Sequence, residues 1–150
     1  MKNMFEAVYV EDIKDRLQQL QPDSKPLWGT MNAAQAVAHC SLGVEMATGD
    51  LRPPRVMIGR ILGPMIKSKA LGDDEPIRKN SPTAKALVVQ DYRDLAAERE
   101  RLTQLIDQFF AAGPQGCTNH PHAFFGTLSP EQWAILMYKH LDHHLRQFSV

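Results

Sequence analysis

Residues 129–148 read SPEQWAILMYKHLDHHLRQF, a stretch that combines a helix start, an apolar face and three of the six histidines of the chain. Ser129 predicts an N-cap, with Pro130 at the first helical position and Gln132 three residues after the cap. A helix over this stretch turns five large side chains toward a core: Trp133, Met137, Leu141, Leu145 and Phe148. We therefore expect a C-terminal helix from Pro130 to about Phe148.

Two N-terminal segments also have the pattern of amphipathic helices. Residues 5–20 place apolar side chains, beginning with Val8, at helical spacing among charged positions. A second helix is expected over 33–48, because Asn32 is a suitable N-cap and Gln35, three residues later, completes a capping box. Both segments are followed by glycine or proline residues that end a helix.

A further helix is predicted within residues 91–113, where an apolar face begins with Tyr92 and the opposite face is charged. Gly113 ends it. The intervening segment, 51–91, is expected to contain a short helix broken by Pro64 and then a loop. A connection this long is unusual unless it covers something or crosses from one end of a bundle to the other.

The four main helices predict an all-α fold, a four-helix bundle that forms a single domain over residues 1–150. No segment alternates apolar and polar residues for long enough to build a sheet. The sequence shows no internal repeat and no glycine-rich phosphate loop.

The composition excludes several classes of partner. The chain has 17 basic and 17 acidic side chains and no long run of one sign, which removes the usual argument for nucleic-acid binding. The N-terminus meets charge too soon for a secretory apolar segment, and no apolar stretch could cross a bilayer. We expect a cytoplasmic protein with no membrane partner. Cys40 and Cys117 are expected to be free thiols.

Three histidines form a candidate metal site. His140 and His144 lie at i and i+4 on the C-terminal helix, with Cβ atoms about 5–6 Å apart, a spacing that lets two imidazoles chelate one cation. A third ligand has to come from another helix. His39 shares a face with Leu42 and Met46 and is expected to point inward. The alternative is a set of buried histidines, each hydrogen-bonded to its own partner.

Two side chains are candidates to support these ligands. His143 lies about 100° from His144 around the helix and is expected at its edge, facing solvent or supporting a ligand. Gln35 lies one turn before His39 and could hydrogen-bond that imidazole and fix its tautomer, although it also belongs to the capping box.

His120 and His122 are expected to be turn or capping residues, with a place at the pocket as the weaker reading. Lys139 and Asp142, on the C-terminal helix, are expected to be solvated. No nucleophile motif or cofactor fingerprint accompanies the histidines, so no catalytic residue is predicted.

Two blocks, LQPDSKPLWGTMNAAQAVAHCS at 20–41 and HPHAFFGTLSPEQWAILMYKHLDHHLRQF at 120–148, resemble the DinB-like (damage-inducible B) superfamily. The similarity covers essentially the whole chain and is greatest to a bacterial branch of unknown function. It implies an up-down-down-up four-helix bundle with a long crossover between the second and third helices. It also implies a divalent metal held by His39, His140 and His144.

The resemblance implies a reaction class less specifically. Relatives include thiol-dependent S-transferases and a maleylpyruvate isomerase that uses a low-molecular-weight thiol. The block HPHAFFG, residues 120–126, is a feature of the branch and not of those enzymes.

Two hypotheses of function remain. The first is a metal-dependent enzyme acting on a small molecule or a low-molecular-weight thiol, with zinc favoured by three imidazoles and nickel, iron, manganese or copper as alternatives. The second is a non-catalytic bundle that contains a structural ion or a buried histidine network and serves dimerisation, as a homodimer, or partner binding.

Overall fold

The computed structural model describes residues 1–150 and contains five α-helices, two short 3₁₀ turns and no strand. The α-helices are α1 (Ala7–Gln19), α2 (Ala33–Thr48), α3 (Met57–Ala70), α4 (Leu95–Ala112) and α5 (Pro130–Gln147), and the 3₁₀ turns are η1 (Lys85–Leu87) and η2 (Gly113–Gly116). The predicted all-α fold is confirmed. No helix is long and apolar enough to span a membrane.

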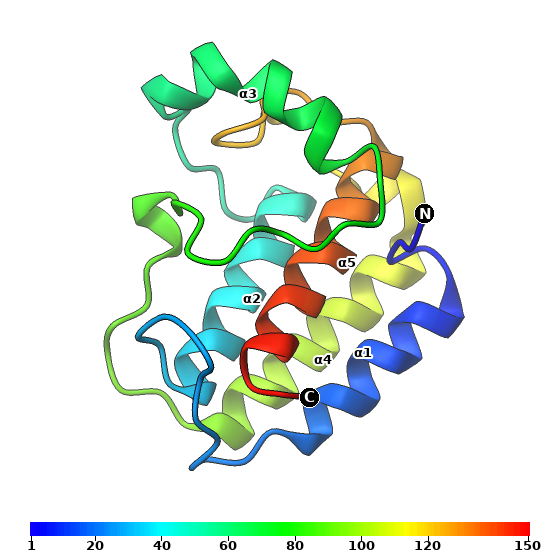
Figure 1. Ribbon diagram of the computed structural model, residues 1–150. Helices are drawn as coiled ribbons and strands as arrows, with labels where there is room; N and C mark the ends of the chain where they lie inside the picture. The colour runs from blue at the N-terminus through cyan, green and yellow to red at the C-terminus, as the bar shows by residue number, and fades with distance from the viewer.

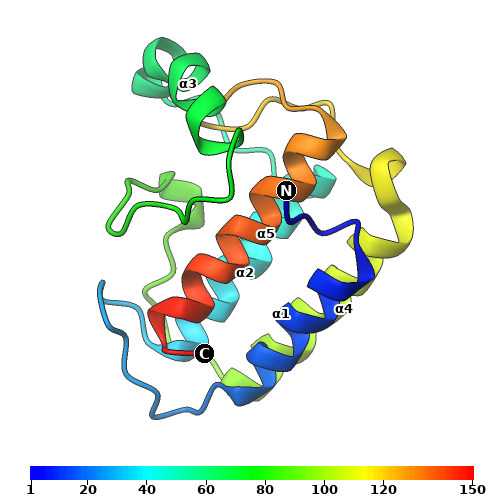
Figure 2. The same cartoon turned by 45° about the vertical axis from the view of Figure 1, so that its right-hand side comes forward.

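Helices α1, α2, α4 and α5 pack side by side, and α3 lies across one end of them (Figures 1 and 2). The Met4 amide donates to the Ala134 carbonyl, so α1 and α5 begin at the same end of the bundle. The Thr118 amide donates to the Ala47 carbonyl, so α2 and α4 finish near one another. In Figure 1, α1 and α5 run away from α3, whereas α2 and α4 run toward it.

The helix starts follow the predicted caps. Both capping boxes are present: the Asn32 side chain accepts from the Gln35 amide, and the Ser129 hydroxyl accepts from the Gln132 amide. Helix α4 begins later than the apolar pattern suggested, because Asp94 is its N-cap.

Two residues that were predicted to face the core are exposed instead. Tyr92 precedes α4 and is 88% exposed. Val8 is 66% exposed, because it lies two positions before the buried Val10 and therefore about 200° away around α1. Trp133, by contrast, is fully buried at the centre of the core, together with Ile13, Leu102, Phe109 and Met137.

The connection between α2 and α4 contains α3 and a strap, residues 72–90. Pro64 does not break α3, which is continuous from Met57 to Ala70. Pro64 is exposed, so the carbonyl that would have accepted its missing amide proton can bond to water. The strap then runs over α2 and α5 (Figure 1).

Two charged residues of α5 are withdrawn from solvent, contrary to expectation: Lys139 is buried and Asp142 is partly buried. The Lys139 ammonium donates to the Ala70 carbonyl at 2.6 Å and the Asp73 carbonyl at 3.0 Å. The Asp142 carboxylate accepts from Arg16 of α1 at 2.9 Å. Lys139 therefore links α5 to the end of α3 and the start of the strap, and Asp142 links α5 to α1.

Candidate metal centre

The rings of His39, His140 and His144 form an almost equilateral triangle between α2 and α5. Their centroids are 4.8 Å (His39–His140), 4.7 Å (His39–His144) and 4.8 Å (His140–His144) apart. One ring nitrogen from each histidine lies within 4.8 Å of the other two. Nε2 of His39 and Nε2 of His140 are within hydrogen-bonding distance, 2.9 Å apart. The chain therefore brings together the three histidines that the helical spacing selected.

Hydrogen bonds fix the tautomers of two of these rings. Nδ1 of His39 lies 2.7 Å from the Leu87 carbonyl of η1, which can only accept. Nδ1 of His39 therefore carries the proton, and the Nε2 lone pair of the neutral ring points into the triangle. The strap thus contributes a backbone carbonyl that orients a histidine of α2.

The ring of His144 is oriented in the same way by Gln147. Its Nδ1 lies 2.9 Å from Oε1 of Gln147. The Gln147 amide nitrogen donates at 2.6 Å to the Trp28 carbonyl, which directs the amide oxygen toward the imidazole. Gln147 is only 2% exposed, so water does not compete for this amide. A carbonyl oxygen on the non-ligating nitrogen is the usual second partner of a metal-binding histidine.

The third ring, His140, packs against the backbone of α2 at Gly43. A Cβ built at Gly43 would lie 2.9 Å from Nδ1 and 3.0 Å from Cε1 of His140. Nδ1 of His140 is buried without a hydrogen-bond partner. Any side chain at position 43 would therefore force this ring to shift.

Burial favours the neutral form of all three imidazoles. Burial lowers the pKa of His39 and, with the neighbouring rings of His144 and His39, brings the pKa of His140 well below its ordinary value. Burial, with the nearby His39, lowers the pKa of His144 to about 3. Neutral imidazole is the form that binds a metal ion.

Gln35 does not contact the histidines. Its side-chain oxygen accepts from the Asn32 amide, and its nitrogen donates to the Asp91 carbonyl, both at 3.0 Å. The predicted role in fixing the tautomer of His39 is therefore wrong, and the capping role is correct. Leu87 takes the place expected for Gln35.

His143 is buried beneath the strap and not exposed at the helix edge. Its Nδ1 lies 3.2 Å from the Ile77 carbonyl, and its ring centroid is 5.0 Å from that of His144. The Trp28 ring covers it at 5.3 Å, and the Lys79 ammonium lies 4.4 Å above that indole. His143 thus joins the strap to the wall of the site.

His120 and His122 lie outside the triangle. Nδ1 of His122 accepts from the amides of Phe124 and Phe125, each at 3.0 Å, which confirms a turn role. Burial lowers the pKa of His122 to about 4. The His120 amide donates to the Thr118 hydroxyl at 3.0 Å.

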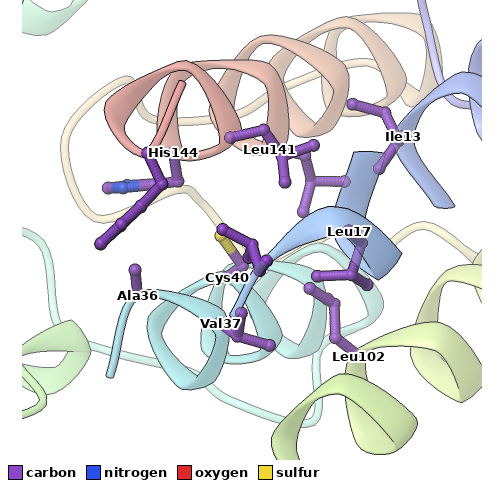
Figure 3. Close-up of a pocket in the computed structure, with 11 residues that line it drawn as sticks. Ile13, Leu17, Ala36, Val37, Cys40, Leu102, Leu141 and His144 are labelled. Carbon is purple, nitrogen blue, oxygen red and sulfur yellow. The ribbon is translucent and has the colours of Figure 1, made fainter. Parts of the chain in front are cut away.

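An apolar pocket borders the site on the core side (Figure 3). His144 forms part of its wall, and the Cys40 thiol projects from α2 among apolar side chains of α1, α4 and α5. Burial raises the pKa of this thiol far above neutrality. Cys40 is therefore a small buried side chain and not a thiolate.

The sequence model of one family, described as "Protein of unknown function (DUF1569)", matches residues 6–150. The chain belongs to the DUF1569 family. This DUF1569 domain includes all five helices and the three histidines. Neither the curated proteins nor the solved structures provide a match to the chain.

Proposed function

We propose that this DUF1569 protein is a metal-dependent enzyme related to the DinB-like superfamily, with His39, His140 and His144 as the ligands of a divalent cation. The observation that carries the proposal is the triangle of neutral imidazoles, two of which have their outer nitrogens bonded to carbonyl oxygens. The shared direction of α2 and α4, joined by a long crossover, supports the relation to that superfamily.

The donor set fits zinc best. Zinc accepts imidazole nitrogens at about 2.0–2.1 Å in tetrahedral geometry, which corresponds to nitrogen–nitrogen distances of about 3.3 Å. The Nε2 atoms of His39 and His140 lie 2.9 Å apart, so a small outward shift of the rings suffices. Three imidazoles also suit nickel, iron, manganese or copper.

A cation held by three protein ligands supplies a Lewis acid with a free coordination position, which lowers the pKa of a bound water or thiol. The surrounding residues set the conditions for that chemistry. Leu87 and Gln147 each hold one imidazole in a single tautomer, and the strap passes over α2 and α5. The pocket wall beside His144 is apolar.

A thiol reaction at this site requires a thiol from outside the chain. Cys40 is buried and its pKa is raised. Cys117 contacts the Pro130 carbonyl at the start of α5, three turns before His140, and burial raises its pKa to about 11. The substrate proposed is therefore a low-molecular-weight thiol, in a transferase or isomerase reaction.

The first experiment measures metal content in protein purified without a histidine tag, stripped and then dialysed against zinc. The proposal predicts one ion per chain, and loss of that ion in His144→Ala. His120→Ala is the matched control, because His120 lies outside the triangle and should leave the content unchanged. Wild-type protein with far less than one ion per chain would overturn the assignment.

Turnover is tested by incubating the zinc-loaded protein with small thiols and electrophilic acceptors. Thiol consumption that requires both the metal and His144 supports an enzyme. A structural ion is the second candidate function. It is favoured by the bonds from His39 and His143 to strap carbonyls, because an ion that fixes these rings would also fix the strap to the bundle. Chelator-induced destabilisation without any thiol turnover would favour this second function.

A further inference from the structure

Helix α3 exposes a continuous apolar surface. We define the α3 stripe as Met57, Ile58, Ile61 and Met65, which are 73%, 58%, 75% and 69% exposed. At about 100° per residue these four side chains occupy roughly 100° of the helix circumference. Figures 1 and 2 both show α3 at the end of the bundle, away from the four packed helices. No other segment of the chain gathers exposed large hydrophobic side chains at this density.

The packing of the opposite face forces this stripe toward solvent. Gly59 and Gly63 are buried against the backbone at Phe124, where a Cβ on Gly59 would come within 2.6 Å of the Phe124 carbonyl oxygen. The Val56 amide donates to the Ala123 carbonyl at 2.9 Å just before the helix begins. A larger side chain on the glycine face would clash with backbone, so α3 has no freedom to rotate its apolar side inward.

The segment around the stripe is strongly cationic. Residues 51–72 contain no carboxylate and five basic side chains: Arg52, Arg55, Arg60, Lys67 and Lys69. Asp50 precedes this run and Asp73, Asp74 and Glu75 follow it, so the positive charge is confined to α3 and the residues that lead into it. Arg60 and Lys69 lie on either side of the stripe, are exposed and make no ion pair.

We propose that α3 is an in-plane anchor that docks the protein on an anionic lipid bilayer, with the α3 stripe in the acyl boundary and Arg60 and Lys69 at the headgroups. An apolar stripe flanked by cations is the pattern of interfacial helices, which lie on a membrane without crossing it. This proposal replaces the expectation of no membrane partner, which rested on segments able to span a bilayer.

A second copy of the chain fits this surface less well. Pairing two α3 helices about a two-fold axis would bring two cationic segments together. A 14-residue helix is about 21 Å long and about 10 Å wide, a footprint on the order of 200 Å², whereas a stable interface covers about 800 Å² on each partner. A bilayer accepts a single helix of this size and matches its charge.

The test is sedimentation of the full chain with vesicles of phosphatidylcholine alone or mixed with phosphatidylglycerol. The proposal predicts binding to the anionic vesicles, at least ten-fold weaker binding to the neutral ones, and release by high salt. Ile61→Ser/Met65→Ser and Arg60→Gln/Lys69→Gln should each weaken binding at least ten-fold. Circular dichroism and thermal melts verify that these surface variants fold.

Matched controls remove the same number of exposed apolar or cationic side chains elsewhere. Val8→Ser/Tyr92→Ser deletes two exposed apolar side chains, and Arg78→Gln/Lys85→Gln deletes two exposed cations of the strap; both should bind like wild type. Equal binding to neutral and anionic vesicles, or equal loss in the controls, would overturn the proposal. So would a concentration-dependent dimer in sedimentation velocity that Ile61→Ser/Met65→Ser abolishes, without vesicle binding.

Discussion

The substitution Gly43→Ala should weaken metal binding, although Gly43 is not one of the proposed ligands. Its Cβ would lie 2.9 Å from Nδ1 of His140, whereas ordinary contacts of a Cβ begin near 3.4 Å. The imidazole must therefore retreat by about 0.5 Å. Metal–ligand distances tolerate only about 0.2 Å, so the displaced ring binds the ion less well. We expect metal affinity to fall on the order of ten-fold to a hundred-fold, as when other ligand-orienting contacts are lost.

The stability of the metal-free protein provides the internal control. Alanine favours a helix interior over glycine by about 1 kcal/mol, and overpacking costs about 1–3 kcal/mol, so Gly43→Ala should lower the unfolding free energy by at most about 2 kcal/mol. In a His140→Ala background the clash is absent. The same substitution should then stabilise the chain by about 1 kcal/mol.

The assay combines competitive zinc titration with thermal melts in chelator for the wild type, both single variants and the double variant. The change of sign between the two backgrounds is the diagnostic result. Wild-type zinc affinity in Gly43→Ala, with no stabilisation in the double variant, would refute the packing of His140 against α2.

Three more outcomes are expected. Gln147→Leu should weaken zinc binding about ten-fold to a hundred-fold by freeing the His144 ring, whereas the exposed Gln108→Leu should not; equal affinities in a zinc titration would contradict this. Burial lowers the pKa of five histidines, so below about pH 6.5 the unfolded metal-free chain binds more protons. As the pH is lowered to about 4, its unfolding free energy should therefore fall by at least about 1.4 kcal/mol per pH unit. A melting temperature that does not change between pH 7 and pH 5 would contradict neutral buried rings. Both thiols should react slowly with Ellman's reagent until the chain unfolds, because the pKa of Cys40 is raised and that of Cys117 is raised to about 11; fast reaction of the native protein would show otherwise.

Local rules were sufficient to predict the four bundle helices. The two capping boxes depend on residues three positions apart, so a short window of sequence contains the whole interaction. The crossover differs, because the conformation of α3 depends on contacts with a loop sixty residues away. Gly59 and Gly63 pack α3 against Phe124. In the sequence alone they look like helix-breaking residues, because the contact with Phe124 is not visible there.

The histidine triangle was predictable because the i, i+4 spacing and the inward face of α2 are local properties. The residues that orient the three rings were less predictable. Gln147 lies at i+3 from His144, so the same spacing argument could have identified it. The Leu87 carbonyl and the Gly43 backbone have no distinguishing side chain, and only the folded strap and helix packing reveal them.

The central claim is that three imidazoles from α2 and α5 bind one ion. The most direct measurement is an anomalous difference map, recorded at the zinc absorption edge, from crystals of untagged protein grown with zinc. The account predicts one peak, about 2.0–2.1 Å from a ring nitrogen of each of His39, His140 and His144. A map without a peak inside this triangle, with the three rings bonded only to protein groups, would contradict it.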